Sequence, residues 1–269
     1  MPNHVTNVLT ITGSDDQKVK EVMDTLFDNE GNITFDNFLP MPQELREVTS
    51  PVRIVSEEER NAEIAEYERK EAAGELGMWD SKRFPLTLEL QDEYIARFGA
   101  DNWYDWAIEN WGTKWGGYDG YRNSDDECTF NSAWNTPYPA MVKLSSMYPD
   151  LVFTIKYADE DFGYNLGEYV LVEGDVVEDY SPTGGSVEAY KMAMDITGDD
   201  YVIDADYINE VYEDEGEITD YVETLLGLAY EVGKVDAYHT DLIERLKEIA
   251  MADDENYEYL QRLIPSDVE

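Results

Sequence analysis

The chain has 269 residues, of which 61 are acidic and 19 are basic, so its formal net charge is -42. A charge of this size repels phosphates and argues against direct binding to nucleic acid or to an anionic membrane. Since 42% of the residues are hydrophobic and 13% aromatic, the chain is not a disordered acidic polymer. We expect a folded protein with a strongly negative surface, divided into two domains.

The cysteine count and the hydropathy of the sequence indicate in which cellular compartment the protein is expected. Cys128 is the single cysteine, so neither a disulfide within the chain nor a thiolate metal cluster is expected, which fits a reducing compartment. The first residues contain no basic segment followed by a long apolar core, and no run approaches the length of a membrane span. We expect a cytoplasmic protein.

The first residues predict a strand followed by a helix. The side chains of residues 4–13 alternate between two sets, as on the two faces of a strand, and many of them are β-branched, which is typical of a strand. Ser14 is expected to cap the helix, whose apolar face carries Val19, Val22, Met23, Leu26 and Phe27. Residues 33–39 are apolar and two prolines follow them, so they predict an edge strand or an extended segment.

A helical insertion is predicted over about residues 43–100. Residues 56–75 are rich in glutamate and alanine with few apolar positions, which indicates a solvated helix. Residues 85–98 predict an amphipathic segment that carries Leu86, Leu88, Leu90, Tyr94, Ile95 and Phe98.

The most distinctive stretch runs over residues 103–119, where four of the six tryptophans fall within thirteen residues: Trp103, Trp106, Trp111 and Trp115. Their spacing predicts a short helix from about Asn102 to Asn110, which Gly112, Gly116 and Gly117 end. Lys114 stands between two tryptophans, where its ammonium could lie over an indole face and reach an anion. An aromatic core corner with one extended lysine is the alternative interpretation.

The following residues predict an antiparallel sheet. The side chains of residues 128–134 alternate between two sets, which predicts a strand. Pro137 and Pro139 then begin a helix, whose inward face is predicted to carry Met141, Val142, Leu144 and Met147. Residues 151–157, 164–172 and 175–180 then predict three consecutive strands. The fold class is therefore α+β, an antiparallel sheet with helices on one face.

Ser181 to Ser186 is the best linker in the chain, so we predict domains at 1–182 and 183–269. The second is expected to be a small, all-α, acidic domain, with helices that begin at Ser186, Asp204 and Thr219 and apolar stripes over 242–250 and 257–264. The sequence from Tyr157 onward contains about thirty-two acidic residues and only five basic ones. The acidic face is therefore assigned mainly to this helical region.

Several segments resemble one family. MPNHVTNVLTITG at the start, FDNFLPMPQEL at 35–45, WYDWAIENWGTKWGGYD at 103–119 and FNSAWNTP at 130–137 are similar to the YubB-like proteins of phages and plasmids. The resemblance covers about residues 1–180 and implies a ferredoxin-like split βαβ sheet and a mobile-element origin. It implies no chemistry and supplies no catalytic residues. His4, where tryptophan is expected, and the acidic tail depart from the family pattern.

No catalytic or metal site is predicted. Asp159, Glu160 and Asp161 do not fit a calcium loop, and a solvated turn explains them better. His4 and His239 are the only histidines, so no zinc set or nucleophile with its base is evident. The glycines after Trp111 lack phosphate-loop spacing. We therefore expect a non-enzymatic protein without cofactor.

Three functions remain. The first is an anti-defence or DNA-mimic inhibitor that blocks a basic, nucleic-acid-binding host protein, because a compact chain of this length, roughly 50 Å across, is comparable in charge and size to a duplex segment with about thirty charges. The second is a structural or assembly module of a mobile element. The third is a small-ligand-binding domain at the tryptophan loop, which requires a concave pocket. Homo-oligomerisation stays open, and the candidate binding residues are Trp111, Lys114, Trp115, Tyr118, Glu213, Asp214, Glu215, Glu217, Asp253, Asp254 and Glu255.

Overall fold

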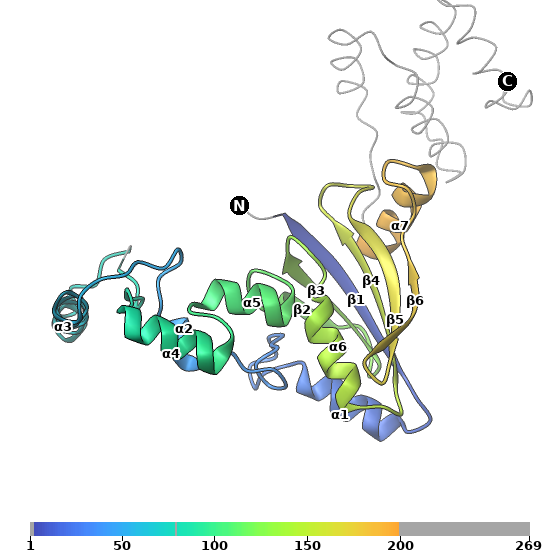
Figure 1. Ribbon diagram of the computed structural model, residues 1–269. Coiled ribbons are helices and arrows are strands. Elements are labelled where there is room, and N and C mark those ends of the chain that lie inside the picture. Colours follow the sequence, from blue (N-terminus) through green and yellow to red (C-terminus); the bar gives the residue numbers. More distant parts are fainter. Residues whose placement is uncertain (1–2, 79, 199–269) are drawn as a thin grey trace, which may run out of the picture. The chain divides into compact units, whose positions relative to one another are not determined.

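The computed structural model describes residues 3–78 and 80–198 and shows an α+β fold built on one six-stranded sheet (Figure 1). The strands lie in the order β2-β3-β1-β4-β5-β6. β1 pairs antiparallel with both β3 and β4, and β2 with β3 and β5 with β6 are antiparallel too. The strands are β1 His4–Thr12, β2 Tyr118–Arg122, β3 Glu127–Ala133, β4 Val152–Asp159, β5 Leu166–Val172 and β6 Asp175–Tyr180.

The first four strands and two helices have ferredoxin-like topology. Along the chain they run β1-α1-β2-β3-α6-β4, where α1 is Asp16–Thr25 and α6 is Tyr138–Met147. In the sheet, β1 lies between β3 and β4, so each helix connects strands that are not adjacent, as in a split βαβ unit. β5 and β6 extend the sheet beyond β4. The predicted fold class is confirmed for this part of the chain.

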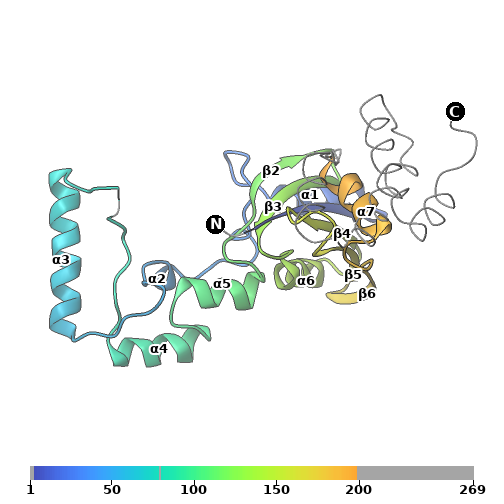
Figure 2. The same ribbon diagram turned by 90° about the horizontal axis from the view of Figure 1, so that it is seen from above.

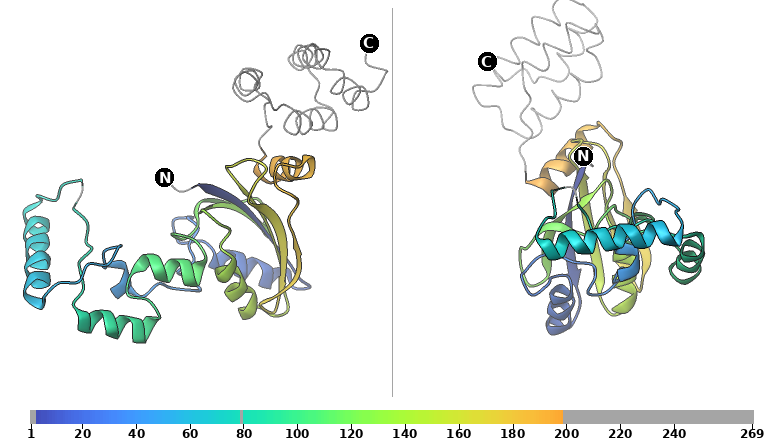
Figure 3. Two further views of the ribbon diagram at one scale, coloured as in Figure 1. Left: turned by 45° about the horizontal axis from the view of Figure 1, so that its top comes forward. Right: turned by 90° about the vertical axis from the view of Figure 1, so that its left-hand side faces the viewer.

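The main core lies between the sheet and its two crossover helices, which cover the same face (Figure 3). Alternate residues of β1 are buried, as the period of two in the sequence predicts. Leu9 and Ile11 belong to one apolar cluster with Val22 of α1 and Leu144 of α6, and all four side chains are fully buried. The sequence pattern thus fixes which face of the sheet the helices cover.

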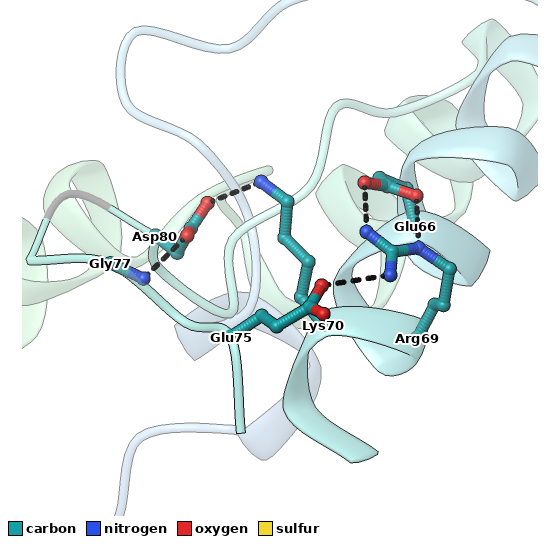
Figure 4. A network of polar contacts seen from close by, with 6 residues as sticks. All are labelled: Glu66, Arg69, Lys70, Glu75, Gly77 and Asp80. Carbon is teal, nitrogen blue, oxygen red and sulfur yellow. Dashed lines mark hydrogen bonds and ion pairs between the residues drawn. The ribbon is translucent and has the colours of Figure 1, made fainter. Parts of the chain in front are cut away.

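Four helices lie in the described part of the chain between α1 and β2, separated by non-helical segments: α2 Gln43–Arg46, α3 Glu57–Ala73, α4 Leu88–Phe98 and α5 Trp103–Trp111 (Figure 2). Two isolated parallel bridges, Val48 with Phe84 and Ile54 with Leu86, join the two non-helical segments that flank α3. α3 has no buried residue, as predicted for a solvated helix. Side-chain ion pairs join its end to the following turn, Arg69 with Glu66 and Glu75, and Lys70 with Asp80 (Figure 4).

Two helix details differ from the sequence-based expectations. Asp15, not Ser14, caps α1, because its carboxylate accepts from the N–H groups of Gln17 at 3.1 Å and Lys18 at 3.3 Å. Met147 is 43% exposed, since it lies about 120° around α6 from the buried Met141.

The two remaining differences concern α4 and the segment after α1. Leu88 and Ile95 are exposed, so Tyr94 is the buried residue of α4. Residues 33–39 form no strand, and Ile33 makes one isolated bridge, with Phe27. The chain then turns, because the N–H groups of Phe38 and Leu39 donate to the carbonyl of Phe35 at 3.2 and 2.8 Å, so the predicted edge strand or extended segment is wrong for residues 35–39.

A second unit contains, among the described residues, 161–167 and 181–198. Its described helix is α7, Val187–Thr197, and the Ser186 hydroxyl caps it by accepting from the N–H of Ala189 at 3.1 Å. The rings of Phe162 and Tyr190 lie 6.0 Å apart, so the β4–β5 loop packs with α7. The boundary at residue 182 stays a prediction, and the helices expected after residue 198 lie outside the described residues.

Candidate functional site

α5 presents the tryptophans, and both of its ends are capped. The Asn102 side chain accepts from the N–H groups of Tyr104 at 2.9 Å and Asp105 at 3.1 Å, which satisfies the first turn. Gly112 ends the helix with φ +79°, a conformation that a glycine adopts without strain. The predicted helix is confirmed, with both ends shifted by one residue toward the C-terminus.

Trp111 is part of the core and is only 4% exposed. Its Nε1–H donates to the carbonyl of Leu39 at 3.0 Å, and its ring meets Phe35 and Trp106 edge to face at centroid distances of 6.1 and 5.3 Å. For this residue the core-corner interpretation is correct. Trp111 therefore mainly positions the loop that follows, and only a small part of its ring reaches the surface.

The loop after α5, residues 112–117, is fastened to β3 by Thr113. The buried Thr113 hydroxyl donates to the carbonyl of Ala133 at 2.7 Å and accepts from the N–H of the same residue at 2.9 Å. Lys114 then projects between two indoles, with its ammonium 4.8 Å from the ring centroid of Trp115 and 5.0 Å from that of Trp134. The predicted cation–π placement is confirmed.

Tyr118 stands beside this loop at the start of β2. Its hydroxyl donates to the carbonyl of Ser132 at 3.2 Å and lies 2.6 Å from Nδ1 of His4. Burial, followed by the nearby charges of Asp119 and Glu160, raises the pKa of Tyr118 to about 12. The phenol therefore stays protonated in mildly alkaline solution as well as at neutral pH and acts as a structural donor.

A concave cavity of about 500 Å³ opens at this loop. Trp111, Lys114 and Trp115 line it, as the ligand-binding interpretation requires, whereas Tyr118 does not. The other lining residues are Ile33, Thr34, Phe35, Asp36, Met41, Arg46, Arg83, Trp103, Gly116 and Gly117. We call this cavity, with the loop 112–117, the tryptophan cavity.

Two arginines of the tryptophan cavity were missed by the sequence reasoning. Arg46 ends α2 and pairs with the carboxylate of Asp36. The Arg83 guanidinium lies 4.6 Å from the ring centroid of Trp103. Both come from the helical insertion, far from the tryptophan stretch along the chain, and no spacing in the sequence connects them to Lys114.

Among residues 3–78 and 80–198, the other candidate residues do not come together in a site. In this range no three histidine, cysteine, aspartate or glutamate side chains are grouped to hold a metal ion, and no helix is long and apolar enough to cross a membrane. Asp159 ends β4 and is buried, where it accepts from the side-chain N–H of Asn3 at 3.0 Å, so the solvated-turn interpretation is wrong for this residue. His239 and the acidic candidates of the tail, Glu213, Asp214, Glu215, Glu217, Asp253, Asp254 and Glu255, lie outside the described residues.

Cys128 gives a testable pH dependence, because burial in β3 raises the pKa of its thiol to about 12. An acid whose pKa is raised by folding stabilises the protein below its unfolded pKa, and this contribution is lost as the pH rises through the folded value. We expect the free energy of unfolding to fall by about 1 kcal/mol per pH unit between pH 9 and 12 from this thiol. Urea unfolding of Cys128→Ala over the same range should show a shallower decline, whereas an equal slope in both proteins would contradict the assignment.

Fold and site together define an α+β protein with a ferredoxin-like domain and a cavity at its tryptophan loop. Residues 110–204, about a third of the chain, match a family model described as the ferredoxin-like domain in Api92-like protein. The crystal structure of protein Api92 from Yersinia pseudotuberculosis is similar with a TM-score of 0.35 and 11% identity, over 68% of this chain and 98% of that one. No curated protein matches the chain.

Proposed function

We propose that this chain is a phage or plasmid protein that binds and blocks a basic, nucleic-acid-binding host protein, as the YubB-like resemblance and the charge suggest together. The observation that carries the proposal is the excess of carboxylates, 61 against 19 basic residues. Such a surface attracts a cationic partner over several ångströms and competes with nucleic acid for it.

The described surface supports this proposal. All six residues of the edge strand β6 are exposed, and its carboxylates Asp175, Glu178 and Asp179 form no ion pair among the described residues. On α3, the carboxylates of Glu57, Glu58 and Glu68 also extend from a helix without buried residues. Basic side chains such as Lys18, Arg53 and Arg97 are paired with carboxylates, so the negative charge that remains belongs to the carboxylates without such a partner.

The test is capture of host proteins by the immobilised full chain, with elution at rising salt. We expect basic nucleic-acid-binding proteins to be retained, to elute as salt screens the charges, and to be displaced by duplex DNA. Capture of neutral partners that are indifferent to salt and DNA would contradict mimicry and favour the assembly module.

Matched variants separate a defined acidic surface from net charge alone. One variant neutralises the tail carboxylates, E213Q/D214N/E215Q/E217Q, and its control neutralises four on α3, E57Q/E58Q/E68Q/E71Q. Both change the charge equally, so a partner that recognises the tail should bind the first variant about tenfold more weakly than the second. Equal weakening by both would leave no role for the tail as a binding surface.

A further inference from the structure

The tryptophan cavity concentrates positive charge in a chain whose acidic residues outnumber its basic ones about threefold. Three cationic side chains line it, and Asp36 is the carboxylate among its lining residues. Asp36 pairs with Arg46, while Arg83 and Lys114 form no ion pair with a carboxylate of the described residues. The lining therefore keeps a local charge opposite in sign to that of the whole chain.

Aromatic rings hold these two cations without neutralising them. Arg83 lies over Trp103 at 4.6 Å, and Lys114 lies between Trp115 and Trp134 at 4.8 and 5.0 Å. A cation–π contact fixes the position of the charge, whereas the N–H groups remain able to donate to an anion. The rings thus organise a positively charged site before any ligand arrives.

We propose that the tryptophan cavity binds a small organic phosphate with a flat ring, of the class of nucleoside monophosphates. Arginine and lysine are the side chains that best match phosphate oxygens, by charge-assisted hydrogen bonds. Indole and guanidinium planes stack on a flat ring. The volume of about 500 Å³ falls within the usual range of small-molecule sites.

The charge of the whole chain favours a small anion over a polymer. A net charge of -42 repels a polyanion that extends over the surface. A monophosphate enclosed in the cavity lies close to Arg83 and Lys114, and distant carboxylates are screened beyond about 8 Å at physiological salt. Nucleic acid is therefore the disfavoured ligand of this site.

Isothermal titration calorimetry of the full chain with the four ribonucleoside monophosphates tests the proposal. The four parent nucleosides and inorganic phosphate serve as the two parts of each ligand. We expect at least one monophosphate to bind about tenfold more tightly than either part, because only the whole ligand uses both rings and cations. The proposal is overturned if none of the four binds at millimolar concentration, if the nucleoside of the tightest monophosphate binds as tightly as that monophosphate, or if a single-stranded oligonucleotide binds more tightly than the monophosphates.

Variants of the cations give the second arm. Lys114→Met and Arg83→Met keep an apolar stem and should each raise Kd about tenfold, the cost of losing one charge-assisted contact. Lys143→Met is the matched control, since Lys143 is an exposed cation on α6 without an ion pair among the described residues, and it should leave Kd unchanged. Asp36→Asn removes the carboxylate of the lining and should lower Kd about threefold.

A gain of affinity in Asp36→Asn cannot come from misfolding, so the pair of opposite shifts is diagnostic. Equal effects of Lys114→Met and Lys143→Met would show that only net charge matters and would overturn the site. Neither result bears on the acidic surface proposed above, because the variants that test that surface leave the cavity residues unchanged.

Discussion

Trp111→Ala is expected to lower the free energy of unfolding by about 3–5 kcal/mol, the usual cost of truncating a buried large aromatic residue. Trp111 is 4% exposed, packs against Phe35 and Trp106, and donates its indole N–H to the carbonyl of Leu39. The variant loses these ring contacts and leaves the Leu39 carbonyl without its donor. Urea unfolding followed by tryptophan fluorescence measures the loss, since all six tryptophans precede Ser181.

Trp115→Ala is the matched control from the same loop. Its ring is 36% exposed and contacts Lys114 and Tyr118 at the rim of the tryptophan cavity. We expect a loss of about 1 kcal/mol or less, because much of the ring surface is already in water. A similar loss for both variants would show that the loop, rather than the buried indole, carries the stability of this corner.

The tryptophan helix could be predicted because its information is local. Asn102 is a strong N-cap, the tryptophans repeat at helical spacing, and Gly112 follows the last turn. The same holds for β1, whose alternation the structure reproduces residue by residue. These elements depend on neighbours within a few positions, so one sequence is sufficient to find them.

β2 was not predicted, because its pattern lacks the apolar alternation of a strand. Tyr118–Arg122 is an edge strand in which no residue is buried. Gly120 reads as a turn signal, but a Cβ there would lie 2.8 Å from Ile33, so close packing against residues distant in the chain selects the glycine. Only the tertiary structure shows that reason.

The cations of the tryptophan cavity illustrate the same limit for the site. Lys114 was found because it lies within the aromatic stretch, whereas Arg46 and Arg83 reach it only through the folding of the insertion. The molecule therefore combines a large excess of carboxylates with a cavity in which Arg83 and Lys114 lie on indole faces. The first suits a large basic partner and the second a small anion, so the two proposals concern different ligands.

Gly112→Ala is expected to lower the free energy of unfolding by about 2–5 kcal/mol, from two causes that act together. The residue has φ +79°, where an alanine is strained, and its Cβ would lie 2.3 Å from Cδ of Pro139 at the start of α6. Relief of that overlap requires the loop and α6 to separate. The tryptophan cavity should widen as a result, which would weaken any ligand held by Lys114.

Gly99→Ala isolates the overlap, because Gly99 ends α4 in nearly the same conformation, with φ +78°, but has no atom within 4 Å of the added Cβ. This variant should lose only the strain of the left-handed conformation, about 1–2 kcal/mol. Urea unfolding of the two variants therefore separates backbone strain from steric contact between the loop and α6. Equal losses would mean that Pro139 moves aside at no cost, and the close approach of α5 to α6 would then not fix the position of the loop.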